Sequence, residues 1–272
     1  MILKAFSKAL YSSWYYYSPD RLLFDCGEGC ALNLKQEIFA IEKIFISHGH
    51  MDHISGILSF LCLRQSTKGD TEKGIDIFYP QGDRSIEILI KTVKDMLGSY
   101  LKYKLTWHPL NPGDRVQLKK GRFMECHQAD HGTENPLVFL IKENRKSLKE
   151  SLRGRPGREL AQLADDDKYD FHEAIVLAYS GDSMPLKAEL YKNASILIHE
   201  CTFLKASDRK WPIHSEVQEV FNLAKEAQVK RLILTHISPR YFNHKIDPLV
   251  EKVNQHDINF DIIYPDKVNC FD

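Results

Sequence analysis

The sequence predicts an α/β protein, because short runs of β-branched and aromatic residues alternate with segments of helical apolar spacing. Residues 41–46 have the composition of a buried strand, and residues 54–63 continue with the spacing of a helix. The same alternation recurs where a strand at 75–80 precedes a helix at 85–97. The chain has 272 residues, 43% of them apolar, enough for one large domain or two closely joined halves. We expect a single domain over residues 1–272.

The other elements of the first two thirds follow from local composition. An aromatic-rich strand at 11–17 and a short strand at 21–25 predict a β-meander at the start of the chain. A helix is expected at 30–39, and the polar, glycine-containing segment 67–74 is expected to be a surface loop. Further strands are predicted at 106–110, 114–118, 121–126, 137–141, 173–179 and 195–198.

The last quarter of the chain combines one clear helix with one clear strand. Apolar residues share one face of a predicted helix at 215–228, and Ser215 is expected to be its N-cap. A hydrophobic strand begins at Arg231. After Asn243 we expect a tail of mixed helix and strand.

Composition argues against several classes of protein. Lys and Arg number 37, as do Asp and Glu, so the formal charge is zero and RNA binding would need local basic charge. No apolar run approaches the ~20 residues of a membrane span. The first residues lack the hydrophobic core and cleavage site of a secretory leader. The 6 scattered cysteines show no disulfide-framework spacing, which fits a reducing cytoplasm.

Four side chains that can bind metal lie close together on a predicted strand-to-helix turn: His48, His50, Asp52 and His53. Imidazole and carboxylate groups are good Zn²⁺ ligands, and a turn can aim His48 and His50 at one ion while the other two reach a second ion. Two such ions can clamp an in-line displacement at phosphorus. Solvated loop histidines are the alternative, but four ligand-type residues directly after a strand favour a metal site.

The spacing His48-x-His50-x-Asp52-His53 resembles the signature of the metallo-β-lactamase superfamily. The resemblance implies a four-layer αβ/βα sandwich in which two mixed sheets pack face to face, with a metal site at one edge. Four further stretches, 25–29, 199–202, 214–216 and 234–241, resemble motifs of the ribonuclease Z family in that family's order. Within them, Cys201 and Glu216 depart from the alanine and threonine of the family.

The resemblance to ribonuclease Z implies two Zn²⁺ ions per chain. Asp182 follows the strand at 173–179, and its two carboxylate oxygens can bind one ion each. A histidine after the strand at 121–126 should complete the first ion's set; the resemblance favours His131, and His127 is the competing candidate. The expected ligands are His48, His50 and His131 for one ion, Asp52, His53 and His236 for the other, and Asp182 between them.

The resemblance further implies hydrolysis of precursor tRNA, which removes the 3′ trailer and leaves a 3′-hydroxyl on the tRNA. Asp52 would be the general base, and His214, oriented and kept protonated by Glu200, would protonate the leaving ribose oxygen. Arg240 would neutralise the scissile phosphate with its planar guanidinium. Asp25 would support the histidine ligands by hydrogen bonds, although its position also suits a helix cap.

Residues 142–168 form a basic, weakly apolar segment that we expect to be an exposed arm. Such a charge run is either a solvated surface insertion or a surface that grips the phosphates of precursor tRNA. Arg153, Arg155 and Arg158 are the arginines expected to contact the tRNA. The family resemblance also implies a homodimer.

Two other functions are compatible with parts of this pattern. A zinc phosphodiesterase of the same fold that acts on small or cyclic phosphodiesters would need no arm. A metal-free RNA-binding or scaffold protein built on an inactive site is disfavoured, because every expected ligand position is filled. Metal content separates this last class from the enzymes, and precursor tRNA compared with a small chromogenic phosphodiester separates the two enzymes.

Overall fold

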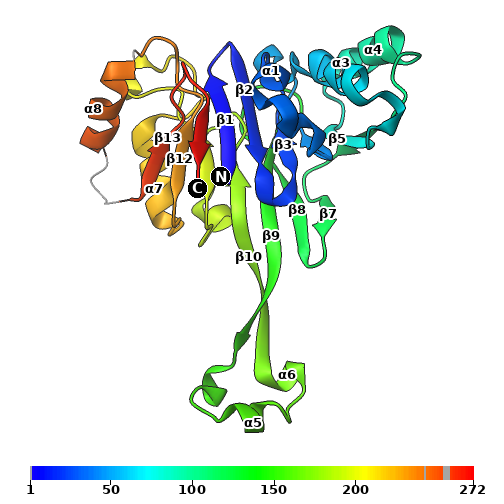
Figure 1. Cartoon of the computed structure of the whole chain (residues 1–272). Helices are drawn as coiled ribbons and strands as arrows, with labels where there is room; N and C mark the ends of the chain where they lie inside the picture. Colours follow the sequence, from blue (N-terminus) through cyan, green and yellow to red (C-terminus); the bar gives the residue numbers. More distant parts are fainter. Residues whose placement is uncertain (1, 242, 254–257) are drawn as a thin grey trace.

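The computed structural model describes residues 2–241, 243–253 and 258–272, and in it two seven-stranded sheets pack face to face (Figure 1). The first sheet has the order β14 (Asn269–Phe271), β1 (Leu3–Lys8), β2 (Ser12–Tyr17), β3 (Leu22–Phe24), β4 (Lys43–Phe45), β5 (Ile75–Pro80) and β6 (Leu105–Leu110). The second has the order β13 (Phe260–Ile262), β12 (Leu232–Thr235), β11 (Leu197–Glu200), β10 (Tyr169–Tyr179), β9 (Leu137–Leu148), β8 (Arg122–Gln128) and β7 (Arg115–Lys119). Both sheets mix parallel and antiparallel pairs.

Helices cover the outer face of each sheet. On the first sheet lie α1 (Cys30–Leu34), α2 (Met51–Ile54), α3 (Ile57–Lys68) and α4 (Arg84–Leu97), and on the second lie α7 (Val217–Glu226) and α8 (Asn243–Val253). Among the described residues, no helix is long and apolar enough to cross a bilayer.

The alternation of side chains along the central strands explains the layers. In β3, Leu22 and Phe24 enter the core between the sheets, whereas Leu23 faces the outer helices. In β4, Phe45 points inward and Ile44 outward. One core therefore lies between the sheets and one lies outside each sheet. The predicted four-layer α/β sandwich with two mixed sheets is confirmed.

The helix α7 begins later than the predicted Ser215 cap. Glu216 is the N-cap, and it forms a capping box with Glu219, whose Oε2 accepts from Glu216 N at 3.2 Å. The hydroxyl of Ser215 donates instead to the backbone oxygen of Ser183 at 2.7 Å. This bond ties the start of the helix to the segment that carries Asp182.

One predicted helix is broken, and one strand was not predicted. The helix expected at 54–63 is interrupted at Gly56, whose backbone N donates to the backbone oxygen of Cys26 at 2.8 Å and not to a residue of the helix. Strand β1 was not predicted, since its mixture of small, charged and apolar residues carries a weak strand signal. It pairs with both β2 and β14, so the two ends of the chain lie side by side (Figure 1).

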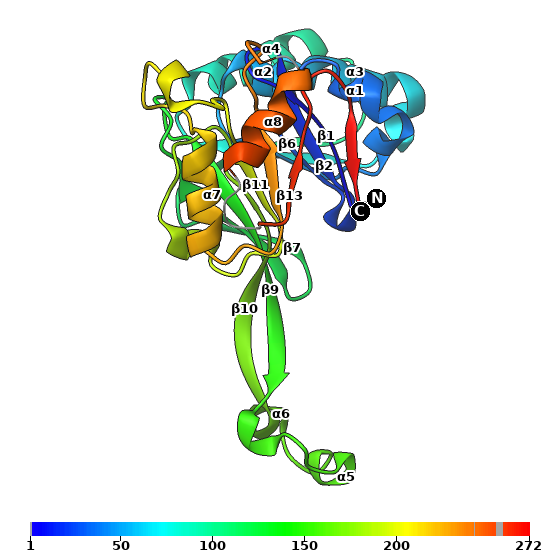
Figure 2. The ribbon, with the colours of Figure 1, turned by 90° about the vertical axis from the view of Figure 1, so that its left-hand side faces the viewer.

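Strands β9 and β10 extend beyond the body as a two-stranded ribbon, with α5 (Gly157–Leu160) and α6 (Asp165–Lys168) at its tip (Figures 1 and 2). The antiparallel pairing continues outward to Leu148 and Tyr169. The sequence predicted only the inner parts of both strands, 137–141 and 173–179. The outer parts are exposed and charged on both faces, so they lack the alternation of a half-buried strand.

Candidate metal centre

The candidate ligands meet at one edge of the sandwich because each follows the end of a strand. His48 and His50 lie in the turn between β4 and α2 of the first half. Across the sandwich, His131 follows β8, Asp182 follows β10 and His236 follows β12. Loops at one edge of two packed sheets thus bring together residues that are far apart in the sequence.

The first ligand group consists of His48, His50, His131 and Asp182, whose ligand atoms all lie within 4.8 Å of one another. His131 Nε2 is 3.3 Å from His50 Nδ1. Two nitrogens bound to one tetrahedral Zn²⁺ at ~2.0–2.1 Å would be roughly 3.3 Å apart. The group therefore has the spacing of a metal site.

The second ligand group consists of Asp52, His53 and His236. His236 Nε2 lies 3.3 Å from Asp52 Oδ2 and 3.2 Å from Asp182 Oδ2. The same Asp182 oxygen is 3.4 Å from His53 Nε2 and 3.9 Å from His48 Nε2. Asp182 thus faces histidines of both groups.

The residues present fit a metal cation. His48 Nε2 and His53 Nε2 are buried and have no hydrogen-bond partner among the described residues, a deficit that bound metal would remove. Burial lowers the pKa of His48, which favours the neutral imidazole that binds metals. Burial raises the pKa of Asp182, but the charges of His236 and His53 outweigh it and hold that pKa well below its usual range. Imidazoles with carboxylates are a donor set for Zn²⁺ and related transition metals.

Asp25 stabilises the turn that carries His48, His50 and His53 by hydrogen bonds to Ser47 and His53. Its Oδ1 accepts from Ser47 N at 2.7 Å, and its Oδ2 accepts from Tyr179 OH at 2.5 Å and from His53 Nδ1 at 2.8 Å. The last bond leaves His53 Nε2 facing the ligand group. Gly29, not Asp25, is the N-cap of α1. The backbone of Asp25 is left-handed, with φ of 53°, an uncommon conformation that these hydrogen bonds hold in place.

Glu200 orients both a ligand and the histidine beside it. Its Oε1 is 3.0 Å from His214 Nδ1, and its Oε2 accepts from Thr202 Oγ1 at 2.9 Å. Thr202 Oγ1 is in turn 3.0 Å from His236 Nδ1. The rings of His214 and His236 are stacked with centroids 5.4 Å apart. Burial lowers the pKa of His214, but the hydrogen bond and charge of Glu200 outweigh it, so that pKa lies above its usual value.

Two predicted residues lie outside the ligand groups. His127 is on β8, where its Nε2 is 2.7 Å from Glu125 Oε1, so His131 and not His127 lies within the first group. Arg240 lies beside His214 in a small pocket, and its Nη1 donates to the backbone oxygen of Asp208 at 3.0 Å.

The three arginines of the arm are exposed, and they lie on α5 or just before it, in the segment at the end of the ribbon (Figure 1). Arg153 forms an ion pair of 2.9 Å with Glu150. Arg155 and Arg158 form no ion pair with any described residue. Their charges are therefore open to an anionic partner.

Several supporting residues were not predicted. Tyr179 and Thr202 bond to Asp25 and Glu200, as described above. Asp83 caps α4 and also accepts from Gly49 N at 2.8 Å, and Gly49 packs on this carboxylate with no space for a side chain. An aspartate before the helix at 85–97 carries a capping signal. Its bond to the histidine turn depends on tertiary packing, which no local pattern reveals.

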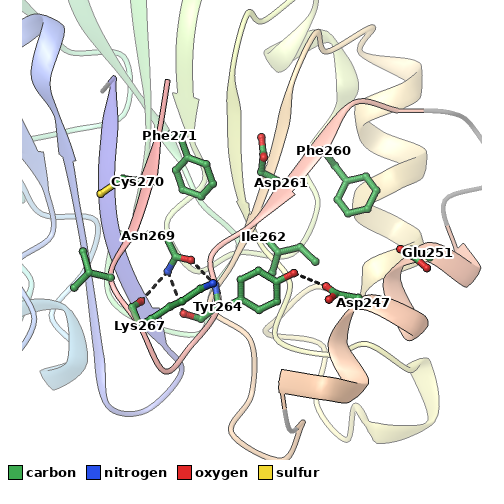
Figure 3. A pocket seen from close by; sticks show the side chains of 11 residues that line it. Asp247, Glu251, Phe260, Asp261, Ile262, Tyr264, Lys267, Asn269, Cys270 and Phe271 are labelled. Atoms are coloured by element: carbon green, nitrogen blue, oxygen red, sulfur yellow. Dashed lines mark hydrogen bonds between the residues drawn. The ribbon is translucent and has the colours of Figure 1, made fainter.

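A hollow of about 540 Å³ lies elsewhere, between α8, β13 and β14 (Figure 3). Tyr264 OH donates to Asp247 Oδ1 at 2.5 Å, and Asn269 Nδ2 donates to the backbone oxygens of Lys267 and Tyr264 at 2.8 and 3.1 Å. These polar groups bond to one another rather than converge on the hollow. None of the candidate ligands lines it. We therefore place the functional site at the histidine cluster.

Comparisons with known proteins agree with this geometry. A ribonuclease Z from Enterococcus faecalis is 34% identical over 261 residues, covering 86% of this chain and 82% of that protein. The short form of human tRNase Z superposes with a TM-score of 0.64 at 22% identity, covering 87% of this chain and 93% of that one. The metallo-β-lactamase fold protein YhfI of Bacillus subtilis gives a TM-score of 0.67 at 20% identity over 98% of both chains. The β-lactamase superfamily domain matches residues 20–237, so this chain belongs to that superfamily and, within it, to the ribonuclease Z family.

Proposed function

We propose that this protein is a zinc-dependent endoribonuclease that removes the 3′ trailer from precursor tRNA and leaves a 3′-hydroxyl on the tRNA. The observation that carries the proposal is the pair of ligand groups around Asp182, in a chain 34% identical to a ribonuclease Z. A paired metal site suits phosphodiester hydrolysis, because it can hold both the attacking and the leaving oxygen.

Two Zn²⁺ ions would occupy the two adjoining groups. When bound, they would lower the pKa of water towards ~7 and so supply a nucleophile at neutral pH. Their protein ligands would be His48, His50 and His131 for one ion, Asp52, His53 and His236 for the other, with Asp182 shared.

Proton transfers would fall to residues of the chain itself. Burial raises the pKa of Asp52, but the hydrogen bond with His236 and the charge of His53 lower it to about 2, so the carboxylate is ionised and can accept a proton from the attacking water. Glu200 Oε1 is 3.0 Å from His214 Nδ1 and so holds the imidazole in place. The other ring nitrogen of His214 would donate a proton to the leaving ribose oxygen.

Arg240 would neutralise the scissile phosphate. Its guanidinium lies beside His214 and uses Nε and Nη1 for bonds to Ser238 Oγ and Asp208 O. A guanidinium has five N–H donors in a planar fork, so donors remain for a phosphate.

The arm would hold the tRNA away from the cut site. Arg153, Arg155 and Arg158 would contact its phosphates, since clustered basic residues supply affinity that does not depend on sequence. We take residues 1–272 as one domain from which the arm, at about 142–168, projects. We further propose a homodimer that acts in the cytoplasm, where thiols stay reduced; the 6 cysteines are free.

The deciding experiment uses the purified protein, a precursor tRNA with a 3′ trailer, and a chelator. We expect cleavage that leaves a 3′-hydroxyl on the tRNA, stops with chelator and returns with Zn²⁺. A small chromogenic phosphodiester is assayed in parallel. Hydrolysis of the small substrate without cleavage of precursor tRNA would replace this proposal with a small-molecule phosphodiesterase. Absence of bound metal and of both activities would indicate a non-enzymatic protein.

A further inference from the structure

A pocket of about 150 Å³ opens beside the imidazole of His214. The ring of His214 is also 4.7 Å from that of His131, so the pocket adjoins the first ligand group. Besides His214, the pocket is lined by two aromatic side chains, two cations, one aliphatic side chain and one carboxylate: Phe203, Trp211, Lys210, Arg240, Ile213 and Asp208.

The loop that carries Trp211 is hydrogen-bonded to the candidate metal centre. The backbone oxygen of Ile213 accepts from His131 Nδ1 at 2.8 Å. Arg209 Nη1 donates to the backbone oxygen of His214 at 3.2 Å, and its two Nη atoms bind both carboxylate oxygens of Glu219 on α7 at 2.5 and 2.7 Å. Trp211 lies between these two anchor points. The loop that carries it is therefore held against the ligands and not merely close to them.

A second set of bonds joins Asp208, which also lines the pocket, to Arg240 and Tyr241. Tyr241 OH donates to Asp208 Oδ2 at 2.5 Å, and Arg240 donates to the backbone oxygen of the same residue. The Arg240 guanidinium lies 5.2 Å from the ring centroid of Phe203. The pocket thus combines a cation and aromatic surfaces in a fixed arrangement.

Trp211 is 72% exposed, whereas Trp14 is fully buried in the core. Indole carries a large apolar surface, and leaving it in water gives up the stabilisation that its burial would provide. Proteins that bind single-stranded RNA use such exposed rings as stacking platforms for unpaired bases. An exposed indole beside a candidate catalytic acid therefore has the properties of a base-binding surface.

We propose that Trp211 stacks on the base of the nucleotide whose ribose oxygen is the leaving group, the 3′-terminal nucleotide of the released tRNA. The inference rests on the proposed function. Because His214 would protonate that oxygen, the ribose would lie against His214, and the pocket that His214 shares with Trp211 is the adjoining space that can receive its base. Lys210 and Arg240 would face the phosphates on either side of this nucleotide. Stacking reads no base edge, so the subsite accepts different bases.

The first test measures binding without cleavage. Zinc-loaded protein is titrated into product tRNA that carries 2-aminopurine as its 3′-terminal base, whose fluorescence falls when it stacks. We expect quenching by the wild type, partial quenching by Trp211→Phe and little by Trp211→Ala. Tyr100→Ala is the matched control, because Tyr100 is an exposed aromatic bonded to Ser66 of α3, outside the pocket. Equal quenching by wild type and Trp211→Ala would overturn the proposal.

The second test separates stacking from a general structural role. On intact precursor tRNA, Trp211→Ala should lower kcat/KM by roughly 5- to 150-fold, the range for loss of one stacked base. On a precursor that is abasic at the nucleotide 5′ of the cut, the same substitution should cost almost nothing. Equal losses on both substrates would overturn the stacking role. Failure of the wild type to cleave precursor tRNA would refute the proposed function instead, a distinct result.

Discussion

Strands β9 and β10 have one end in the metal centre and the other in the arm, and the two ends differ in almost every physical respect. At the inner end, Leu137 N donates to Ser47 O at 2.8 Å and Tyr179 OH bonds to Asp25, all within the buried core. At the outer end, roughly 36 Å along a strand of 12 residues, the side chains are exposed.

The difference predicts how each region responds to the substitution of a single residue. In the centre, the ligand imidazoles of His53 and His236 are aimed by bonds to the buried side chains of Asp25 and Thr202. In the arm, an exposed ion pair such as Lys146 with Asp165, 3.1 Å apart, contributes little to the free energy of unfolding. Loss of one such pair should therefore change the arm little. Single substitutions should therefore be severe in the centre and graded in the arm.

The largest effect should follow His50→Ala, because it removes a ligand of the first group. We expect loss of bound metal, measured by elemental analysis, together with a fall of precursor cleavage to background. His127→Ala is the matched control, since His127 is a half-exposed histidine bonded to Glu125 outside both groups. Retention of both ions and full turnover in His50→Ala would show that the ligand assignment is wrong.

His214→Ala should keep its metal and its fold and lose ~10²–10⁴-fold in cleavage rate, the range typical of a positioned general acid. Metal content and circular dichroism are measured beside the rate. Near-normal turnover on precursor tRNA would remove His214 from the mechanism.

The pH profile gives a second measurement of the same role. An acid must be protonated to donate, so the wild-type rate should fall as pH rises through the raised pKa of His214. Glu200→Gln removes the charge that raises this pKa, so the fall should move to lower pH. The single-turnover rate is followed across the pH range at saturating zinc. An unchanged profile in Glu200→Gln would separate Glu200 from the protonation of His214.

Asp25→Asn should have a smaller effect, because it alters a partner of the ligands and not a ligand. The substitution removes the carboxylate charge that accepts from His53 Nδ1. The affinity for metal should therefore fall by ~10–100-fold, as is typical for partners that orient ligands. Zinc affinity is measured by competition with a chromogenic chelator. Asp76→Asn serves as the control, since Asp76 also bonds a histidine, His108, at 2.9 Å but in a half-exposed pair on β5 and β6. Equal affinities of wild type and Asp25→Asn would contradict the supporting role.

The same contrast explains what the sequence could predict. Strand ends and ligand spacing are local features, so the α/β class and the turn at 48–53 could be predicted from short stretches. The family resemblance added the four layers. Contacts such as Tyr179 to Asp25 join residues 154 positions apart, and no periodicity encodes them. The choice between His127 and His131 also needed geometry, because both come after the strand predicted at 121–126.

The shape of the arm could not be predicted, for a different reason. Alternation of apolar and polar residues indicates a strand only where one face is buried. Between Lys142 and Leu148 no residue is buried, and beyond Asn144 the backbone pairing of the strand is with β10. Composition could therefore predict an exposed basic segment but not a ribbon.

The smallest effect on chemistry should come from the arm. Replacing Arg153, Arg155 and Arg158 by Ala should raise KM for precursor tRNA and leave kcat unchanged, because the tip lies far from the ligand groups. The salt dependence should also weaken, with the slope of log K against log salt reduced by roughly 2 to 3 if all three contact phosphates. Arg153 already pairs with Glu150, so Arg155 and Arg158 should account for most of the change.

The control for the arm removes the same charge from the body, by replacing the exposed Lys187, Lys192 and Lys230 with Ala. Binding is measured at several salt concentrations, and a small phosphodiester is hydrolysed in parallel. That hydrolysis should be untouched by the arm substitutions, since a substrate without a tRNA body cannot reach the tip. Equal losses on both substrates would mean that the arm supports the fold or the dimer. Equal losses from arm and body variants would mean that binding follows net charge and not the position of the arm, which would remove the contrast between the two ends of β9 and β10.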